Sequence, residues 1–445
     1  MENNTQLKEM IRSMVIDILQ GQKQEMASSQ PIKKAPRGQV EPGVFDTVDE
    51  AIQAAKAAQA RFEDCTLATR EKVIADIRAT MRPRVQELAQ KTVEETGMGR
   101  VADKVLKLNL TLDKTPGVED LVTECETGDN GMTLYELSAY GVIGAITPST
   151  NPAETLICNT IGMLAAGNAV FFSVHPGAKH LSRLLVSELN QIIAKSIGIE
   201  NLIVTLREPS IESAQEMMLH PDVSLLVVTG GPGVVKQALQ SGKKVIGAGA
   251  GNPPAFVDET ADIKKAAQDI VLGASLDNNI LCIAEKSVVA MRQIEPQLVQ
   301  EMVKAGCVLI DNQQDIQRLV DLTVLPNGTP NKKFVGKNAS VILDAAHIPY
   351  NGDPRLIIMR TPKDHPFAVI EMLMPILPVV TVDSFDEGLD VCLMLEAGLH
   401  HTATMHSLNM ERLNRMARKM KTSIFVKNGP SYAGLGFSGE GTTTF

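Results

Sequence analysis

Two short motifs lie close together near the middle of the chain. The first reads Ile246-Gly247-Ala248-Gly249-Ala250-Gly251-Asn252-Pro253-Pro254, and the second reads Asp277-Asn278-Asn279-Ile280-Leu281-Cys282-Ile283-Ala284-Glu285-Lys286. Glycine has no Cβ, so the first motif lets the backbone approach a ligand closely. The second places Cys282 in a polar loop with Lys286 nearby. Cationic surroundings favour the reactive thiolate, so we interpret Cys282 as a candidate nucleophile, although a lone cysteine is more often a core residue.

Short apolar runs alternate with amphipathic helical segments on both sides of these motifs. Such strands with helical crossovers are typical of parallel sheets covered on both faces. Upstream, we expect strands at 142–146, 169–174, 202–206, 225–228 and 244–246. Downstream, we expect them at 286–290, 341–343, 356–360, 376–382, 402–405 and 423–427. The sequence therefore predicts an α/β protein with a Rossmann-type cofactor domain at 44–248, a second α/β domain at 249–428 and a C-terminal segment at 429–445.

Composition excludes several classes of function. The chain has 445 residues, 44% hydrophobic residues and a net charge of −9, which predicts a globular protein and makes nucleic acid an unfavourable partner. Its six cysteines have no paired spacing, so neither a zinc site nor a disulfide framework is expected. The adjacent His400 and His401 lack further ligands nearby, and we expect no metal site. We find no 18-residue apolar run or signal peptide, and expect no membrane contact.

The N-terminus has a different pattern. Apolar residues at positions 7, 10, 11, 14, 15, 18 and 19 predict an amphipathic helix over residues 1–20. Residues 21–43 lose this periodicity and are rich in Gln, Ser, Pro and Gly, which is typical of a flexible linker. A short isolated helix is marginal in water, so its apolar face needs a partner. That partner is either the chain's own folded body or another protein.

The two central motifs together resemble the aldehyde dehydrogenase superfamily, and within it the CoA-acylating branch. Most members carry Glu-Leu-Gly-Gly-Lys in the glycine turn, and that Glu activates the water that releases the acid. Aligning the glycines places Ala248 at the position of the Glu. A methyl group cannot act as a general base, so the resemblance implies that the thiol of coenzyme A releases the acyl group. The similarity covers about residues 44–445.

The resemblance also implies roles for individual residues. Cys282 is the expected nucleophile, and the amide of Asn151 is expected to donate to the oxyanion, although Asn-Pro is also a common turn. Glu371 is expected to hold the nicotinamide ribose of NAD. The other expected cofactor-binding residues are Thr147, Pro148, His175, Pro176, Thr229, Gly230, Gly231 and Gly249. His175 stands where the family often has Lys, and no acidic residue lies near it, so the choice between NAD and NADP stays open.

The implied reaction is oxidation of a short aliphatic aldehyde to acyl-CoA through a cysteine thiohemiacetal and thioester. Similar residues at 115–120, 282–286 and 431–434 favour the propionaldehyde dehydrogenases of bacterial propanediol-utilisation microcompartments. An acetaldehyde-specific enzyme is the near alternative. A hydrolytic enzyme with Glu285 or Glu371 as its base, and a catalytically weak scaffold protein, also stay open.

The resemblance implies two kinds of assembly. Residues 1–20 are similar to encapsulation peptides, so we expect binding to a microcompartment shell protein within the bacterial cytoplasm. A hairpin at about 124–140 is expected to serve a homo-oligomer, either a dimer or a dimer of dimers. In the family, the segment after residue 439 continues into a strand that pairs with a neighbouring subunit. This chain stops at Phe445, so we expect weaker dimer-of-dimers assembly.

Overall fold

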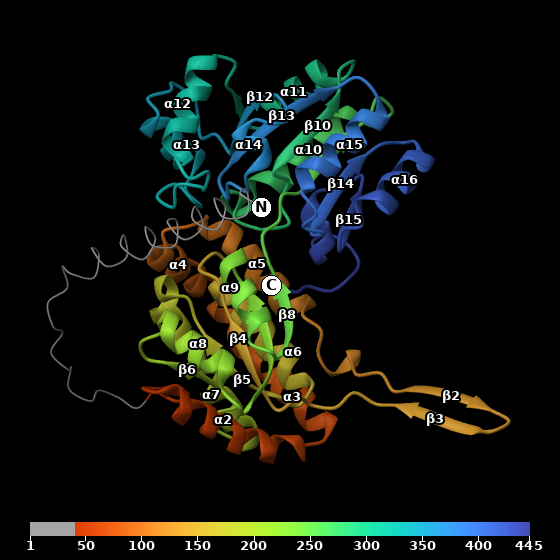
Figure 1. Cartoon of the computed structure of the whole chain (residues 1–445). Helices are drawn as coiled ribbons and strands as arrows, with labels where there is room; N and C mark the ends of the chain where they lie inside the picture. Colours follow the sequence, from red (N-terminus) through yellow and green to blue (C-terminus); the bar gives the residue numbers. More distant parts are fainter. Residues whose placement is uncertain (1–40) are drawn as a thin grey trace, which may run out of the picture. The chain divides into compact units, whose positions relative to one another are not determined.

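The computed structural model describes residues 41–445, which form two parallel sheets and one antiparallel hairpin (Figure 1). The predicted helix at 1–20, and the predicted linker as far as residue 40, lie outside the described residues. Gly43, at the end of that linker, is already joined to the fold, because its carbonyl accepts a hydrogen bond from the Thr205 amide at 2.9 Å.

The first sheet has six parallel strands in the order β1-β6-β5-β4-β7-β8. The strands are β1 (Val44–Phe45), β4 (Val142–Ile146), β5 (Ala169–Ser173), β6 (Ile203–Leu206), β7 (Val223–Thr229) and β8 (Lys244–Ala248). The helices are α2 (Val48–Glu63), α3 (Leu67–Met81), α4 (Val85–Thr96), α5 (Val101–Lys114), α6 (Pro152–Ala165), α7 (Lys179–Ile197), α8 (Ile211–Leu219) and α9 (Pro232–Gln240). Strand order reverses at β4, because β5 and β7 lie on opposite sides of it. This is the Rossmann-type arrangement that the sequence predicts.

The second sheet has seven parallel strands in the order β11-β12-β13-β10-β9-β14-β15. The strands are β9 (Pro254–Val257), β10 (Ser287–Met291), β11 (Cys307–Leu309), β12 (Leu356–Arg360), β13 (Ile376–Val382), β14 (Thr402–His406) and β15 (Ile424–Lys427). The helices are α10 (Ile263–Ser275), α11 (Glu295–Lys304), α12 (Gln313–Thr323), α13 (Ala339–Ala345), α14 (Pro366–Val369), α15 (Phe385–Glu396) and α16 (Met410–Met420). The α/β class is therefore confirmed for both sheets.

Three details of the second sheet differ from the prediction. The strand expected at 341–343 is wrong, because these residues lie inside helix α13. A three-residue apolar run fits either structure, and here Ile342 and Leu343 are buried in a core cluster formed by helices and by strands β12 and β13. Strands β9 and β11 were not predicted. The first begins at a proline and the second has three residues, so neither carries a clear signal.

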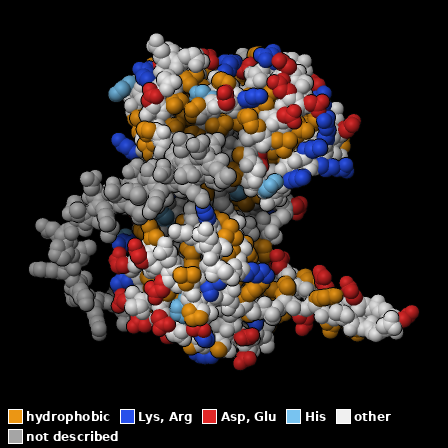
Figure 2. Space-filling model, viewed as in Figure 1, with side chains coloured by type: hydrophobic (Ala, Val, Ile, Leu, Met, Phe, Trp, Pro, Cys, Tyr) orange, Lys and Arg blue, Asp and Glu red, His pale blue; other side chains and the backbone are white. Residues whose placement is uncertain are grey.

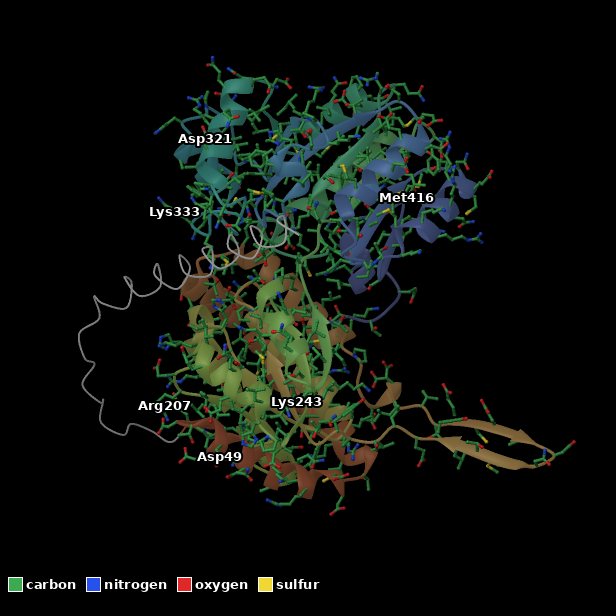
Figure 3. All side chains as sticks on the ribbon, in the orientation of Figure 1. Asp49, Arg207, Lys243, Asp321, Lys333 and Met416 are labelled. Carbon is green, nitrogen blue, oxygen red and sulfur yellow. The ribbon has the colours of Figure 1, made fainter. Side chains whose placement is uncertain are left out.

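Local contacts define where several elements begin and end and join neighbouring strands. Thr47 caps α2 by accepting from the Glu50 amide, and Gly97 ends α4 in the left-handed conformation, with φ of 65°. Lys243, labelled in Figure 3, donates from Nζ to the carbonyl of Val223 at 2.7 Å, which joins the starts of β7 and β8. Met416, also labelled there, is buried against the second sheet.

The predicted hairpin forms as strands β2 (Glu124–Gly128) and β3 (Gly131–Tyr135), which pair only with each other among the described residues. Figure 1 shows it extending away from the helices around the first sheet. All of its residues are exposed, including Met132, Leu134 and Tyr135, and Figure 2 shows hydrophobic side chains along it. A lone hairpin is marginally stable in water, so this surface suits an interface.

Within residues 41–445, no helix has the length and apolar character needed to cross a membrane. The same residues contain no group of three or more His, Cys, Asp or Glu side chains that could hold a metal ion.

Candidate active site

A left-handed turn precedes Cys282. Asp277, Asn278 and Asn279 all have positive φ, of 51°, 57° and 65°. This conformation costs about 1–2 kcal/mol per residue for most side chains, and Asn and Asp tolerate it best. Three such residues in a row therefore need strong support from their surroundings.

Each residue of the turn is held by a different part of the fold. Asp277 Oδ1 accepts from the Arg100 amide at 2.9 Å. The Asn278 side chain donates to the Gly336 carbonyl at 2.8 Å. The Asn279 side chain spans the turn itself, donating to the carbonyls of Ala274 and Glu285 at 2.7 and 3.0 Å. All three side chains are buried, so water does not compete for these bonds.

Lys286 fixes the loop that carries the thiol. Its buried Nζ donates to the Asn279 carbonyl at 2.7 Å, to Asn279 Oδ1 at 2.6 Å and to the Leu281 carbonyl at 2.9 Å. Burial lowers the pKa of Lys286 to about 8, and the negative groups around it, first among them Glu371, oppose that shift. Lys286 therefore holds the loop in place next to the thiol and also provides a nearby positive charge.

Cys282 is half-buried and lies close to Gly251 and His401. A Cβ added at Gly251 would be 2.6 Å from the Cys282 carbonyl oxygen and 2.9 Å from Cγ of His401. The Gly251 amide donates to Glu371 Oε1 at 3.1 Å. Burial, and then the charge of Glu371, raise the pKa of Cys282 to about 11, and Lys286 opposes this. Burial and the Glu371 charge therefore favour the protonated thiol over the thiolate.

The two candidate bases of the hydrolytic alternative have different surroundings. Both oxygens of Glu285 are occupied, because the amide and hydroxyl of Ser431 donate to them at 2.8 and 2.7 Å. Glu371 faces the thiol region, and burial raises its pKa above the ordinary value. Ala248 ends strand β8 opposite Thr229 and brings no carboxylate to the site.

Asn151 lies at the start of α6 and is buried. Its Oδ1 accepts from Lys107 Nζ at 2.5 Å, and its Nδ2 donates to Thr150 Oγ1 at 3.3 Å. Lys107 also pairs with Asp277 at 2.5 Å. The predicted oxyanion donor and the turn before Cys282 therefore share one buried cation.

Except for Glu371, which follows α14 beside the second sheet, the predicted cofactor residues gather at the carboxyl edge of the first sheet. Ile146 pairs with Ser173 and Val228, and Thr229 pairs with Ala248, so strands β4, β5, β7 and β8 end together. The residues that follow these ends are Thr147 and Pro148, His175 and Pro176, Gly230 and Gly231, and Gly249. This edge contains the strand-order reversal at which open α/β sheets bind ligands.

Several features of this edge fit a dinucleotide. The buried hydroxyl of Thr147 has no hydrogen-bond partner within the described structure. Gly231 starts α9 without a side-chain cap, and a Cβ at Gly231 or Gly249 would meet open space. The Gly231 and Gly233 amides at this helix start donate to no group of the described residues, and such free amides suit a pyrophosphate. The His175 ring instead accepts from the Gly177 amide at 3.0 Å, and burial followed by the charge of Lys332 lowers its pKa.

The family model described as "Aldehyde dehydrogenase family" matches residues 18–443. The chain belongs to the aldehyde dehydrogenase family. It is 50% identical over 444 residues to the CoA-propanoylating propanal dehydrogenase of Salmonella typhimurium, with 100% of this chain and 93% of the relative covered.

Two solved structures extend the family comparison. Propionaldehyde dehydrogenase of Rhodopseudomonas palustris, with bound CoA and an acylated cysteine, is 48% identical with a TM-score of 0.89, over 91% of this chain and 93% of that one. A propionaldehyde dehydrogenase from the fucose-utilisation microcompartment of Clostridium phytofermentans is 47% identical with a TM-score of 0.89, again over 91% and 93%. These values confirm the predicted kinship with CoA-acylating aldehyde dehydrogenases.

The sequence prediction missed the buried charges behind the site. Lys104 and Lys107 are fully buried on α5, and Glu154 is fully buried on α6. One signal was available, since Lys104 falls three residues after Val101 and four before Leu108, on the apolar stripe of the helix. It also missed that His401 lies beside Gly251 and Cys282.

Proposed function

We propose that this aldehyde dehydrogenase converts a short aliphatic aldehyde, with propionaldehyde favoured, to acyl-CoA using NAD and coenzyme A. One observation carries the proposal. Strand β8 ends with Ala248, and the glycine turn that follows it lies beside the Cys282 loop. Most members of the family carry a water-activating carboxylate at the position of Ala248, and this carboxylate is missing here. The similarity to CoA-propanoylating and propionaldehyde dehydrogenases supports the same substrates.

Cys282 begins the reaction by attacking the aldehyde carbon. Its thiol proton passes to water, and the carbonyl oxygen gains the negative charge. We assign stabilisation of this oxyanion to the Asn151 Nδ2 group and the Cys282 amide. The strand edge at Thr147, Gly231 and Gly249 would hold NAD, which would supply the hydride acceptor. The thiohemiacetal on Cys282 then becomes a thioester.

Acyl transfer to coenzyme A completes the cycle. The CoA thiol loses its proton, its sulfur attacks the thioester carbon, and the Cys282 thiolate leaves. His401 is suited to accept the CoA proton, because its ring lies against Gly251 beside Cys282, and burial and then the charge of Lys286 lower the pKa of the ring, which favours its neutral form. A thiolate is intrinsically a better nucleophile than water, so the missing carboxylate at residue 248 is not needed for this step.

The test is NADH formation from propionaldehyde with and without CoA, with products separated as acyl-CoA and free acid. We expect multiple turnovers to propionyl-CoA only when CoA is present, and faster turnover than with acetaldehyde. Cys282→Ser should abolish hydride transfer, while Cys392→Ala, at a buried position in the second core, should retain it. Rapid acid formation without CoA would support the hydrolytic alternative. No NADH in either case would support a scaffold role.

We propose further that residues 1–20 bind a microcompartment shell protein in the bacterial cytoplasm. The relative from a Clostridium phytofermentans microcompartment supports this location. Removal of residues 1–40, which keeps Gly43 and its bond to Thr205, should leave kcat and KM nearly unchanged and stop co-localisation with the shell in cells. Loss of activity in the truncated protein would instead make this segment part of the catalytic fold.

A further inference from the structure

Lys107 is a fully buried lysine with three polar partners. Its Nζ contacts Asn151 Oδ1 at 2.5 Å, Asp277 Oδ2 at 2.5 Å and Glu154 Oε1 at 3.1 Å. Its side chain has no solvent exposure, and the same holds for both carboxylates. An ammonium group has three N–H donors and no acceptor. One of the three contacts, to Asn151 Oδ1, is a hydrogen bond, and the other two are ion pairs with buried carboxylates.

The contact with Lys107 determines which end of the Asn151 amide is a donor. The two ends of an amide have nearly the same shape, but only the oxygen can accept from an ammonium group. Oδ1 must therefore face Lys107, and Nδ2 must face the other way. Nδ2 carries two N–H groups, and Thr150 Oγ1 receives one of them at 3.3 Å. The second N–H donates to no other group among the described residues, so it is available to a substrate oxygen.

Lys104 provides a comparison within the same cluster. It is also fully buried and pairs with Asp277 at 2.9 Å, but its hydrogen bond goes to the Thr150 carbonyl rather than to the Asn151 side chain. If the cluster only stabilised the fold, the two lysines would be equivalent for turnover. The geometry makes them different, because only Lys107 touches the amide.

We propose that Lys107 is a positioning residue for aldehyde oxidation, which fixes the Asn151 amide with its N–H directed at the developing oxyanion. This inference rests on the proposed function. Without Lys107 the amide can rotate, and half of its orientations present oxygen to a negative charge. The interaction matters chiefly in the transition state, so its loss lowers kcat and kcat/KM together while KM changes little.

The test compares two double variants with the same change in buried charge. Lys107→Met/Glu154→Gln leaves the Lys104–Asp277 pair, and Lys104→Met/Glu154→Gln leaves the Lys107–Asp277 pair. We expect kcat for CoA-dependent NADH formation to fall about 10- to 100-fold in the first and no more than about threefold in the second, since one oxyanion donor contributes a factor of about 10²–10³. Lys107→Arg, which keeps a cationic donor, should recover part of the loss.

The Asn151→Ala background separates a positioning role of Lys107 from a role in folding. In Asn151→Ala, adding Lys107→Met/Glu154→Gln should lower kcat no further, because the residue through which Lys107 acts is already absent. Equal losses in the two double variants, or an undiminished loss in the Asn151→Ala background, would overturn the inference. If the Lys107→Met variant does not fold, a kcat of Lys107→Arg that lies between those of wild type and Asn151→Ala supports positioning, and a wild-type kcat in Asn151→Ala overturns it. Failure of the proposed function is a separate result, namely a wild-type protein that forms no acyl-CoA.

Discussion

At the scale of single residues, some neighbours of Cys282 raise the pKa of its thiol and others lower it. Burial and the charge of Glu371 raise its pKa to about 11, and Lys286 acts against them. Since the thiolate is the nucleophile, this balance sets the reactive fraction of the free enzyme. The carboxylate of Glu371 is the part of the balance that substitution can remove with little change in shape.

Glu371→Gln should make Cys282 more reactive. The amide oxygen can still accept from Gly251, but the negative charge is gone, so the pKa of the thiol should fall. We expect the pH profile of iodoacetamide alkylation between pH 7 and 11 to shift to lower pH. Cys282→Ala identifies the signal from the other cysteines. An unchanged or higher alkylation pKa would show that Glu371 does not control the thiol.

Ala248→Glu should restore part of the hydrolytic chemistry. Residue 248 is exposed at the end of β8, so a longer side chain has room to enter solvent near the glycine turn. We expect the ratio of free propionate to propionyl-CoA to rise about tenfold or more, in line with general-base contributions of about 10²–10⁴. Ala248→Gln, with the same size and no basic carboxylate, is the matched control. An equal ratio in the two variants would contradict the role given to position 248.

At the scale of elements, two features define the position of the thiol. They are the left-handed turn before Cys282 and the close contact of Gly251 with Cys282 and His401. A side chain at 251 would overlap the Cys282 carbonyl and the His401 ring. Neither neighbour is a flexible chain end, so the backbone itself would have to shift. Small displacements of reacting groups cost about 10²-fold in rate.

Gly251→Ala should therefore lower kcat by about 10- to 100-fold without unfolding the protein. Gly162→Ala is the matched control, because it lies within α6 and an added Cβ there meets nothing within 4 Å. Steady-state kinetics and thermal melting of both variants would check this. A wild-type kcat in Gly251→Ala would mean that the contact of residue 251 with Cys282 and His401 can accept a methyl group without moving the thiol.

Local sequence pattern was sufficient for most elements but not for the connections between them. Apolar runs marked β4, β5 and β13 because both faces of each strand are buried. The same criterion misplaced residues 341–343, which are apolar because a helix buries them. The site could be located from the glycines and Cys282, because close backbone approach and thiol chemistry each require a particular residue type that is visible in the local sequence. The pairing of Lys107 with Asp277 left no such local signal, because it joins segments far apart in the chain.

At the scale of the whole molecule, Glu285 connects the nucleophile loop to the C-terminal segment through Ser431. Burial raises the pKa of Glu285 to about 7 from an ordinary value of 4.5, and Ser431 opposes the shift. The folded protein therefore binds this proton more tightly than the unfolded chain does. Its contribution to stability is complete below pH 4.5 and is lost as the pH rises through 7.

Glu285→Gln should flatten this pH dependence. Between pH 4.5 and 7, the wild-type free energy of unfolding should fall by up to about 3 kcal/mol through this group, since one pKa unit corresponds to about 1.4 kcal/mol. Urea unfolding of both proteins at pH 5 and pH 8 would measure the difference. Parallel losses of stability in wild type and variant would assign the pH dependence to other groups.

The support of the left-handed turn has a consequence for synthesis on the ribosome. Its residues are held by Arg100 and Lys107 from early in the chain and by Gly336 from much later, and the thiol's neighbours Glu371 and His401 come later still. A nascent chain that has just released Cys282 has only part of this scaffold. The thiol therefore acquires its reactive setting near the end of translation, after most of the polypeptide has left the exit tunnel. An unfinished chain therefore contains Cys282 but lacks the residues that make its thiol catalytic.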